Sequence, residues 1–194
     1  ADNGARALFY GINSLPELRI DGRSAGYTLE VPKRRLLRSP FQITTELDTS
    51  NLEAGIGIRS SIQLVDTSLG SKALVLTTVI VEHTAEGNGA LFHQVVRHLL
   101  PNAAGIRLAD SRSLDATKEL QRTWFPSRKP SSDHYVVSFL QDEQTKEIYQ
   151  ATIDTLREAL VYDFYQAAHP SNAQAQKIAN LHCFPNPASN TLTI

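Results

Sequence analysis

Apolar and polar residues alternate along much of the chain from Pro40 onward, and this period of two is typical of strands with one buried face. In PFQITTELD every second residue after the proline is apolar or threonine, and in AGIGIRSSIQLVD the aliphatic residues again share one face. The buried face is predicted to hold Phe41, Ile43, Thr45, Leu47, Ile56, Ile58, Ile62 and Leu64. Both stretches are therefore expected to be strands with one side in water.

Later stretches complete a β-rich pattern. KALVLTTVIVEH, Lys72 to His83, is apolar on both faces and rich in β-branched residues, which predicts a strand inside a sheet. TKELQRTWFP indicates another strand, and HYVVSFLQD and KEIYQATI, separated by EQT, are expected to form a hairpin. Strands joined by polar turns in this way predict a mainly β protein with an immunoglobulin-like β-sandwich over residues 40–153.

One stretch within the sandwich does not follow the alternation. In GALFHQVVRHLLPNAAG the apolar residues recur at helical spacing, although paired valines are equally common in strands. We expect a strand-like crossover that contains a helical turn.

The first residues have a different pattern, with a helix from Ala5 to Tyr10 that stops at Gly11, then a short strand from Glu17 to Ile20 and an Asp-Gly turn. This order resembles the back half of a thioredoxin-like domain, and residues 1–26 would be its trailing part. The resemblance implies that Pro16 is the cis-proline of such a domain, a bond that a tight loop can hold. The Cys-x-x-Cys of a redox enzyme is not in this sequence and would have to lie upstream.

Residues 27–39 are predicted to connect the two parts, and they include the basic cluster KRRLLR, Lys33 to Arg38. Our first interpretation is a solvated connector whose leucines pack down while its cations face water. The alternative is a patch for anionic glycans or lipid headgroups.

Residues 154–181 are expected to form a short helix followed by a linker. Leu156, Leu160 and Phe164 are four apart, and Asp154 could cap the helix start. The following residues are small and polar with no sustained period, which is the composition of a linker.

Two further stretches resemble known proteins. VEHTAEGNGALFHQVVRHLLPNAAG and VVSFLQDEQTKEIYQA are similar to the β-sandwich that follows a thioredoxin-like domain in Bacteroidota outer-membrane and secreted proteins of the Omp28-related type. The resemblance implies a location that is secreted or on the outer-membrane surface. Because the chain has no methionine, we interpret it as an internal fragment of a longer protein.

Residues 182–194 resemble the start of the C-terminal sorting domain that directs proteins through type IX secretion. The matching motif consists of Phe184, Pro185, Asn186, Pro187 and Ala188. The two prolines stiffen an extended turn before an alternating stretch. The resemblance implies the type IX secretion machinery as a partner, and the alternative is a frayed terminus with no addressing role.

Composition narrows the possible functions. The 194 residues have a formal net charge of −1, which argues against a nucleic-acid surface, and no apolar run is long enough for a membrane span. The single cysteine, Cys183, cannot form an internal disulfide or a zinc site. No hydrolase or phosphate-loop motif is present.

Glu82, His83, His93 and His98 lie close in sequence, but their spacing does not match a metal site, so we expect no metal and no cofactor. Two residues remain as binding candidates. Arg97 could form a fixed ion pair, and Trp124 could stack on a sugar or peptide, with core packing as its alternative.

These observations predict a non-catalytic cell-surface module for spacing or for binding a protein or glycan ligand. The alternative function is the C-terminal part of a thioredoxin-like thiol-disulfide oxidoreductase whose cysteines lie upstream.

Overall fold

The computed structural model describes residues 2–14, 17–24, 31, 33–34, 36–50, 55–67, 70–108, 117–126 and 133–156. Its elements are α1 (Asp2–Tyr10), β1 (Arg19–Ile20), β2 (Arg23–Ser24), β3 (Phe41–Asp48), β4 (Ile56–Leu64), β5 (Leu74–Gly87), β6 (Ala90–Leu100), β7 (Ile106–Arg107), β8 (Lys118–Trp124), β9 (His134–Asp142) and β10 (Ile148–Thr155). Among these residues, no helix combines the length and the apolar character needed to cross a bilayer.

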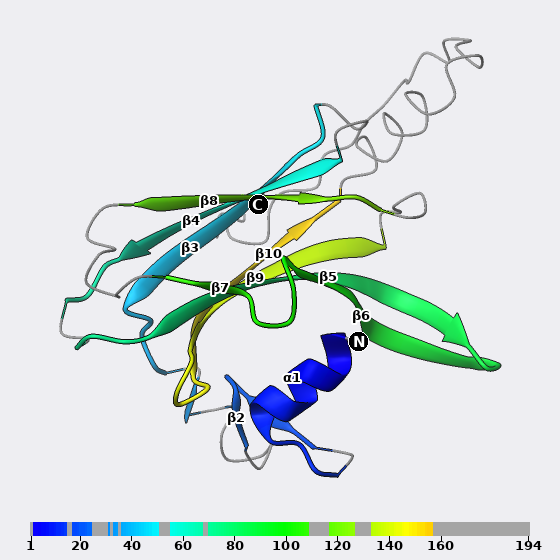
Figure 1. The fold of residues 1–194 in the computed structure, drawn as a ribbon, viewed down its shortest axis with the longest axis horizontal. Helices are drawn as coiled ribbons and strands as arrows, with labels where there is room; N and C mark the ends of the chain where they lie inside the picture. Colours follow the sequence, from blue (N-terminus) through cyan, green and yellow to red (C-terminus); the bar gives the residue numbers. More distant parts are fainter. Residues whose placement is uncertain are drawn as a thin grey trace, which may run out of the picture.

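Two antiparallel sheets pack face to face as a β-sandwich (Figure 1). One sheet has the order β3-β4-β8, and the other has the order β10-β9-β5-β6, with β7 paired to β5 as well. The predicted interior strand is β5, which has β9 on one side and β6 and β7 on the other. The predicted hairpin is β9–β10, in which Ala151 is opposite Phe139.

The core between the sheets follows the predicted alternation. Buried and exposed residues alternate along β3 and β4, and the first eight residues of β5 are all buried. The two apolar clusters between the sheets are Phe41, Ile43, Ile62, Leu64, Leu74, Leu76, Leu108 and Leu140 in one, and Ile56, Ile58, Ile80, Trp124, Val136 and Leu156 in the other.

A chain of buried hydroxyl groups joins the two sheets within this core. The Ser60 hydroxyl lies 3.3 Å from that of Thr45 and 3.4 Å from that of Ser138, which lies 3.2 Å from the Thr78 hydroxyl. All four residues are buried. Each buried hydroxyl therefore has a hydrogen-bond partner inside the protein in place of water.

The stretch that departed from the alternation forms β6, so the helical turn predicted there is wrong. Pairing with β5 extends from Gly87 opposite Ala90 to Thr78 opposite Leu100, with one irregularity beside Ile80. In the ladder, the backbone groups of β6 that face β5 are paired, and a helical turn would have interrupted this pairing. The strand ends at a cis bond between Leu100 and Pro101.

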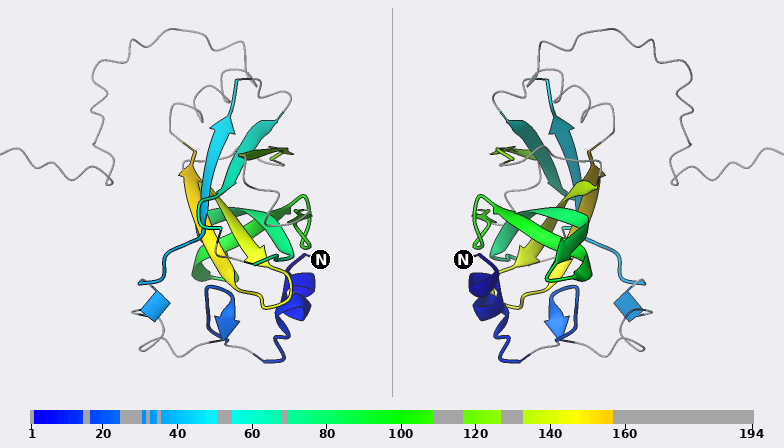
Figure 2. Two further views of the ribbon diagram at one scale, coloured as in Figure 1. Left: turned by 90° about the vertical axis from the view of Figure 1, so that its left-hand side faces the viewer. Right: turned by 90° about the vertical axis from the view of Figure 1, so that its right-hand side faces the viewer.

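The N-terminal segment lies at the end of the sandwich that carries the β9–β10 turn (Figure 2). Gly11 ends α1 as predicted, with a φ of 65° and its N–H bonded to the Leu8 carbonyl. Asp21 and Gly22, with φ values of 49° and 79°, form the predicted tight turn between β1 and β2. The strand is shorter than expected and begins at Arg19.

The connector differs from our first interpretation, in which its leucines pack down. Leu36 is 84% exposed and Leu37 is 62% exposed, so that expectation is wrong. Arg34 lies inward instead, with a side chain that is only 12% exposed. The reason is electrostatic, because Arg34 forms ion pairs with the carboxylates of Asp21 and Glu147.

The helix predicted to start at Asp154 cannot start there, because Asp154 belongs to the last strand of the sandwich. Asp154, which was expected to cap it, lies in β10 opposite Val136, and β10 extends to Thr155. The rest of that helix, the linker and the sorting motif lie outside the described residues.

Candidate functional site

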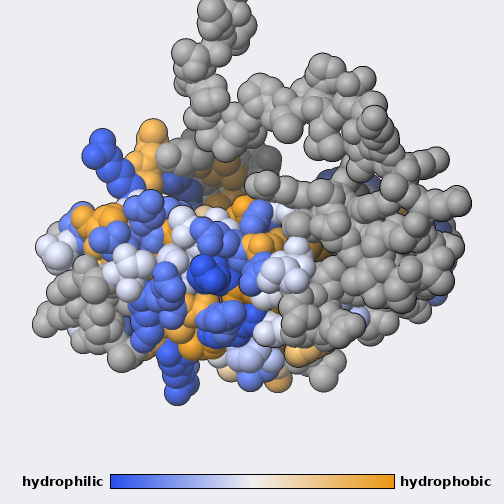
Figure 3. Space-filling view, turned by 90° about the horizontal axis from the view of Figure 1, so that it is seen from above, coloured by the Kyte–Doolittle hydropathy of each residue, from blue (hydrophilic) through white to orange (hydrophobic). Residues whose placement is uncertain are grey.

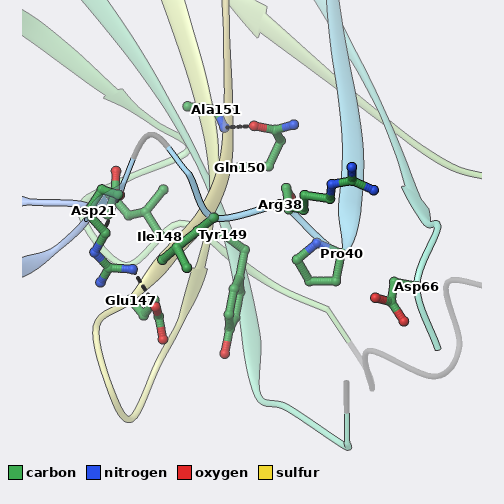
Figure 4. A pocket seen from close by; sticks show the side chains of 12 residues that line it. Asp21, Arg38, Pro40, Asp66, Glu147, Ile148, Tyr149, Gln150 and Ala151 are labelled. Carbon is green, nitrogen blue, oxygen red and sulfur yellow. Dashed lines mark hydrogen bonds and ion pairs between the residues drawn. The ribbon is translucent and has the colours of Figure 1, made fainter. Parts of the chain in front are cut away.

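A groove of about 690 Å³ lies between the connector and the start of β10 (Figure 4). Arg34, Arg38 and Pro40 come from the connector side, and Glu147, Tyr149 and Gln150 come from the β9–β10 hairpin. In a view from above, hydrophobic residues of the described part form separate areas among hydrophilic ones (Figure 3). The groove brings together residues from the connector and from the β9–β10 hairpin, and we therefore treat it as the candidate site.

Most of the charge near Glu147 is already paired. The Arg34 guanidinium lies 2.7 Å from Glu147 Oε1 and 3.7 Å from Asp21 Oδ2, and Arg23 lies 2.5 Å from Glu147 Oε2. Burial alone would raise the pKa of Glu147, but hydrogen bonds from Arg34 and Arg23 outweigh it and lower that pKa. Glu147 is thus a fixed anion that ties the hairpin β1–β2 and the connector to the sandwich.

Tyr149 and Gln150 form the apolar and polar floor of the groove. The Tyr149 ring lies 5.7 Å from that of Phe41, and burial, aided by the charges of Asp142 and Glu147, raises the pKa of Tyr149 to about 12. Gln150 Nε2 donates to the Phe41 carbonyl at 3.4 Å, and Gln150 Oε1 accepts from the Ala151 N–H at 3.2 Å. One side chain therefore bridges the edges of both sheets.

Neither Tyr149 nor Glu147 is placed to exchange a proton near neutral pH. Tyr149 stays protonated at neutral pH and can only donate or share a hydrogen bond, because its pKa is far above that range. Glu147 is held as an anion by two arginines and is not poised to exchange a proton. In the described part of the chain, no group of three His, Cys, Asp or Glu residues could hold a metal ion.

A second set of contacts fixes α1 against the sandwich. Gln141 is fully buried, its Oε1 accepts from Arg6 Nη2 at 3.0 Å, and its Nε2 donates to the Tyr10 hydroxyl at 2.9 Å and the Lys146 carbonyl at 2.7 Å. Arg6 also donates to the Tyr10 hydroxyl at 2.7 Å and lies over the Phe9 ring at 4.6 Å. We call this set the Gln141 junction.

Backbone contact completes the attachment. The Ile148 N–H donates to the Asp21 carbonyl at 2.9 Å. A Cβ on Gly22 would lie 1.8 Å from the Lys146 carbonyl oxygen, so the two turns touch backbone to backbone. Only glycine permits this approach.

The two predicted binding residues do not meet in one site. Trp124 is 4% exposed, which agrees with the core-packing alternative, and its ring centroid lies 6.3 Å from His98 and 5.9 Å from His134. Arg97 is on β6 and forms the expected ion pair, with Glu82. Pro16 and the motif Phe184 to Ala188 lie outside the described residues.

The sequence reasoning missed Arg34, Glu147 and Gln141. The only local signal nearby was the Asp21-Gly22 pair. It indicated a tight turn, but it did not show which residues the turn contacts. A lone Gln in an alternating strand gives no such signal, since its burial depends on another segment.

Comparison with known proteins shows the fold alone. No protein-family model and no curated protein matches the sequence. The structure is similar to HBP35 of Porphyromonas gingivalis, with a TM-score of 0.61 and 15% identity over 94% of this chain and 61% of that chain. A domain of the outer membrane lipoprotein Omp28 from Porphyromonas gingivalis gives a TM-score of 0.45 and 12% identity, over 61% of this chain and 97% of that one, which is too weak to establish a shared fold. The chain thus spans 61% of the HBP35 chain and shares its fold over that length.

Proposed function

We propose that this chain belongs to a non-catalytic, secreted cell-surface protein, in which an immunoglobulin-like β-sandwich holds a preceding α/β segment at a fixed position and offers surfaces for a protein or glycan ligand. The observation that carries this proposal is the Gln141 junction. A segment joined only by a flexible connector would not need a fully buried glutamine whose amide oxygen and nitrogen are both bonded to it or to the adjacent turn.

Energetics support a fixed arrangement. Removing the amide of Gln141 would leave the Lys146 carbonyl without the bond from Gln141, which costs about 1–3 kcal/mol for a buried polar group. Arg6 would lose its bond to Gln141 but keep those to the Tyr10 hydroxyl and the Ala103 carbonyl. The ion pairs of Glu147 with Arg23 and Arg34 add to the attachment from the other side of the turn. Two separate sets of contacts resist rotation better than one.

The experiment measures how well the distance between the two parts is defined. Spin labels are placed through Leu8→Cys and Gln121→Cys, both exposed positions, after Cys183→Ser removes the native thiol. We expect one narrow distance distribution from pulsed electron resonance, which broadens at least about twofold in Gln141→Leu.

The matched control is Gln63→Leu, an exposed glutamine on β4 whose replacement should leave the distribution narrow. A broad distribution in the unaltered protein, or equal broadening in both variants, would contradict the spacing function.

The immunoglobulin-like assignment is supported by the strand order. The order β10-β9-β5-β6 facing β3-β4-β8 has the arrangement of an immunoglobulin-type sandwich in which an extra strand follows strand C on the larger sheet. The fold similarity to HBP35 of Porphyromonas gingivalis supports the resemblance to Bacteroidota surface proteins.

Export by type IX secretion is the further part of the proposal, and the motif at Phe184 to Ala188 supports it. A reporter fused to residues 174–194 and their native continuation should reach the cell surface of a host with type IX secretion. The same fusion with Pro185→Ala and Pro187→Ala should reach it less efficiently. A reporter retained in the periplasm without these changes would count against the address.

A second candidate function is the C-terminal part of a thiol-disulfide oxidoreductase. The observation that favours it is the order of α1, a Gly11 stop and a hairpin with an Asp-Gly turn, which follows the predicted thioredoxin-like pattern. Reading the frame upstream of Ala1 tests this candidate. A Cys-x-x-Cys there, with insulin reduction by the longer protein, would favour it over the non-catalytic proposal, and its absence would remove it.

A further inference from the structure

Strand β6 lies at the edge of its sheet. The sheet has the order β10-β9-β5-β6, so among the described strands β6 pairs with β5 alone. The residues from Ala90 to His98 are exposed apart from Val95, which is partly exposed. An edge strand presents unpaired backbone N–H and C=O groups to any other strand, and proteins usually protect it with charged residues or proline. The segment 90–96, ALFHQVV, contains no Lys, Arg, Asp, Glu or Pro.

The outer half of the β5–β6 hairpin has only two strands. Strand β9 pairs with β5 as far as Glu82, opposite His134, whereas β5 and β6 stay paired to Gly87, opposite Ala90. In Figure 1 this hairpin extends beyond the neighbouring strands of its sheet. Two strands alone are marginally stable in water, and further strands stabilise them. The end of the hairpin is therefore the part of the sheet that an added strand would stabilise most.

The turn of the hairpin fixes which backbone groups of β6 face outward. Asn88 and Gly89 have φ values of 51° and 75°, as in a two-residue turn of type I′. In such a hairpin the two residues beside the turn bond to each other, and the following residues of each strand bond alternately outward and inward. Counted from the turn, the outward N–H and C=O groups are those of Leu91, His93 and Val95.

A positive φ at Gln94, of 57°, does not reverse this direction. The register with β5 is the same on both sides of Gln94, with Thr84 opposite His93 and Glu82 opposite Val95. The alternation therefore holds from the turn to the irregularity near the end of the strand.

We propose that the β6 edge binds the β6 edge of a second copy of this chain, antiparallel and with Gln94 on the two-fold axis. One face of β6 carries two exposed apolar residues, Phe92 at 51% and Val96 at 38%. With Gln94 on the axis, Phe92 lies opposite Val96 of the second copy, and this pair occurs twice. His93 and Val95 of the two copies also lie opposite each other and bond through their outward backbone groups.

The spacing of the apolar residues favours a second copy as the partner. An antiparallel strand that fits Phe92 and Val96 presents apolar residues four positions apart, and β6 itself does so. Pairs of an aromatic and a β-branched residue stabilise a sheet, and their side chains are closest where no backbone bond joins the pair, as here. No like charges meet, because Leu91 lies opposite Arg97, whose guanidinium is paired with Glu82.

The association is expected to be weak and reversible. It joins residues 91–97 of each copy, or about seven residues a side, compared with about 20–30 in a standard interface. We therefore expect a dissociation constant on the order of 100 μM. The inference does not depend on the spacing function, because the Gln141 junction lies at α1 and the β9–β10 turn.

Sedimentation velocity of the full chain tests the pairing, with Cys183→Ser in every sample so that no disulfide can link two copies. From about 5 to about 500 μM, we expect the weight-average sedimentation coefficient to rise from that of a monomer toward that of a dimer. Phe92→Lys and Val96→Glu should each raise the dissociation constant about tenfold or more, because each change breaks both apolar pairs.

An equimolar mixture of these two variants tests the register. In the mixed pair the introduced lysine faces the introduced glutamate, and the remaining Phe92 faces the remaining Val96. Association should therefore return to within about threefold of the parent chain. The matched control is Ile153→Lys, which changes a residue that is 64% exposed on β10, at the other end of the sheet order, and should associate like the parent chain. Circular dichroism of each variant verifies that the fold is kept.

Several outcomes would overturn this pairing. A monomer at every concentration would do so, and it would leave the β6 edge to a strand of another protein. Equal weakening by Ile153→Lys would place the contact elsewhere on the molecule. A mixture that associates no better than the single variants would exclude the proposed register.

Discussion

Replacing Gly22 with alanine tests directly how the N-terminal segment is held against the sandwich. Gly22 has a φ of 79°, and a Cβ there would lie 1.8 Å from the Lys146 carbonyl oxygen. Two costs therefore combine. An alanine in the left-handed region costs about 1–2 kcal/mol, and moving the turn away weakens the bond from the Ile148 N–H to the Asp21 carbonyl, worth about 1 kcal/mol.

The expected result is a local loosening of about 2–3 kcal/mol. Amide hydrogen exchange at Ile148 measures this loosening directly, because the Ile148 N–H is bonded to the Asp21 carbonyl of the neighbouring turn. A loosening of that size should speed exchange at this amide by roughly 30- to 150-fold, at about 1.4 kcal/mol for each tenfold change. Amides in β5 should keep their protection, since that strand packs inside the sandwich.

Gly89→Ala provides the matched control. Gly89 has a φ of 75° but nothing lies within 4 Å of a Cβ placed there, so the variant has the backbone cost without the collision. It should leave exchange at Ile148 unchanged. If Gly22→Ala leaves this amide as protected as before, or Gly89→Ala exposes it equally, the close contact between the two turns does not hold the segment.

Three further results are expected from other parts of the structure. Ser138→Ala removes the middle of the buried hydroxyl chain and should lower the free energy of unfolding in urea by about 1–3 kcal/mol. Tyr149 has a pKa raised to about 12, so the stability tied to its neutral form should be complete below about pH 10 and fall between about pH 10 and 12, and Tyr149→Phe should lose the late step in an absorbance titration at high pH. Arg34→Gln should raise the pKa of Glu147 toward its ordinary value in a carbon-detected NMR titration, because one of the two arginines that lower it is gone.

Controls for these results come from the same chain. Ser61→Ala changes a half-buried serine outside the hydroxyl chain and should cost much less than Ser138→Ala. Arg59→Gln removes an exposed ion pair with Glu46 at 3.9 Å and should leave the Glu147 titration unchanged. Equal losses from the two serine variants, an ordinary tyrosine titration throughout, or an unmoved pKa of Glu147 in Arg34→Gln would each contradict the corresponding argument.

The sequence by itself determined the strands β3, β4 and β5, whereas the apolar spacing of β6 suggested a helical turn that the structure does not contain. Period-two alternation in β3 and β4 and the apolar run of β5 reflect the pleat, which directs successive side chains to opposite faces whatever their partners are. Gly11 and the Asp21-Gly22 pair were also readable, because they supply a backbone conformation that other residues adopt at a cost. These features depend on neighbours in the chain.

Only the tertiary structure decided which side of the connector faces inward and which residues make the junction. Arg34 lies inward with a side chain that is 12% exposed, because carboxylates from two distant turns, at Asp21 and Glu147, lie beside it, and Leu36 is exposed. Gln141 is buried because α1 packs over it, a contact between residues more than a hundred positions apart. Such partners are brought together by the packing of the sheets, and no local period encodes them.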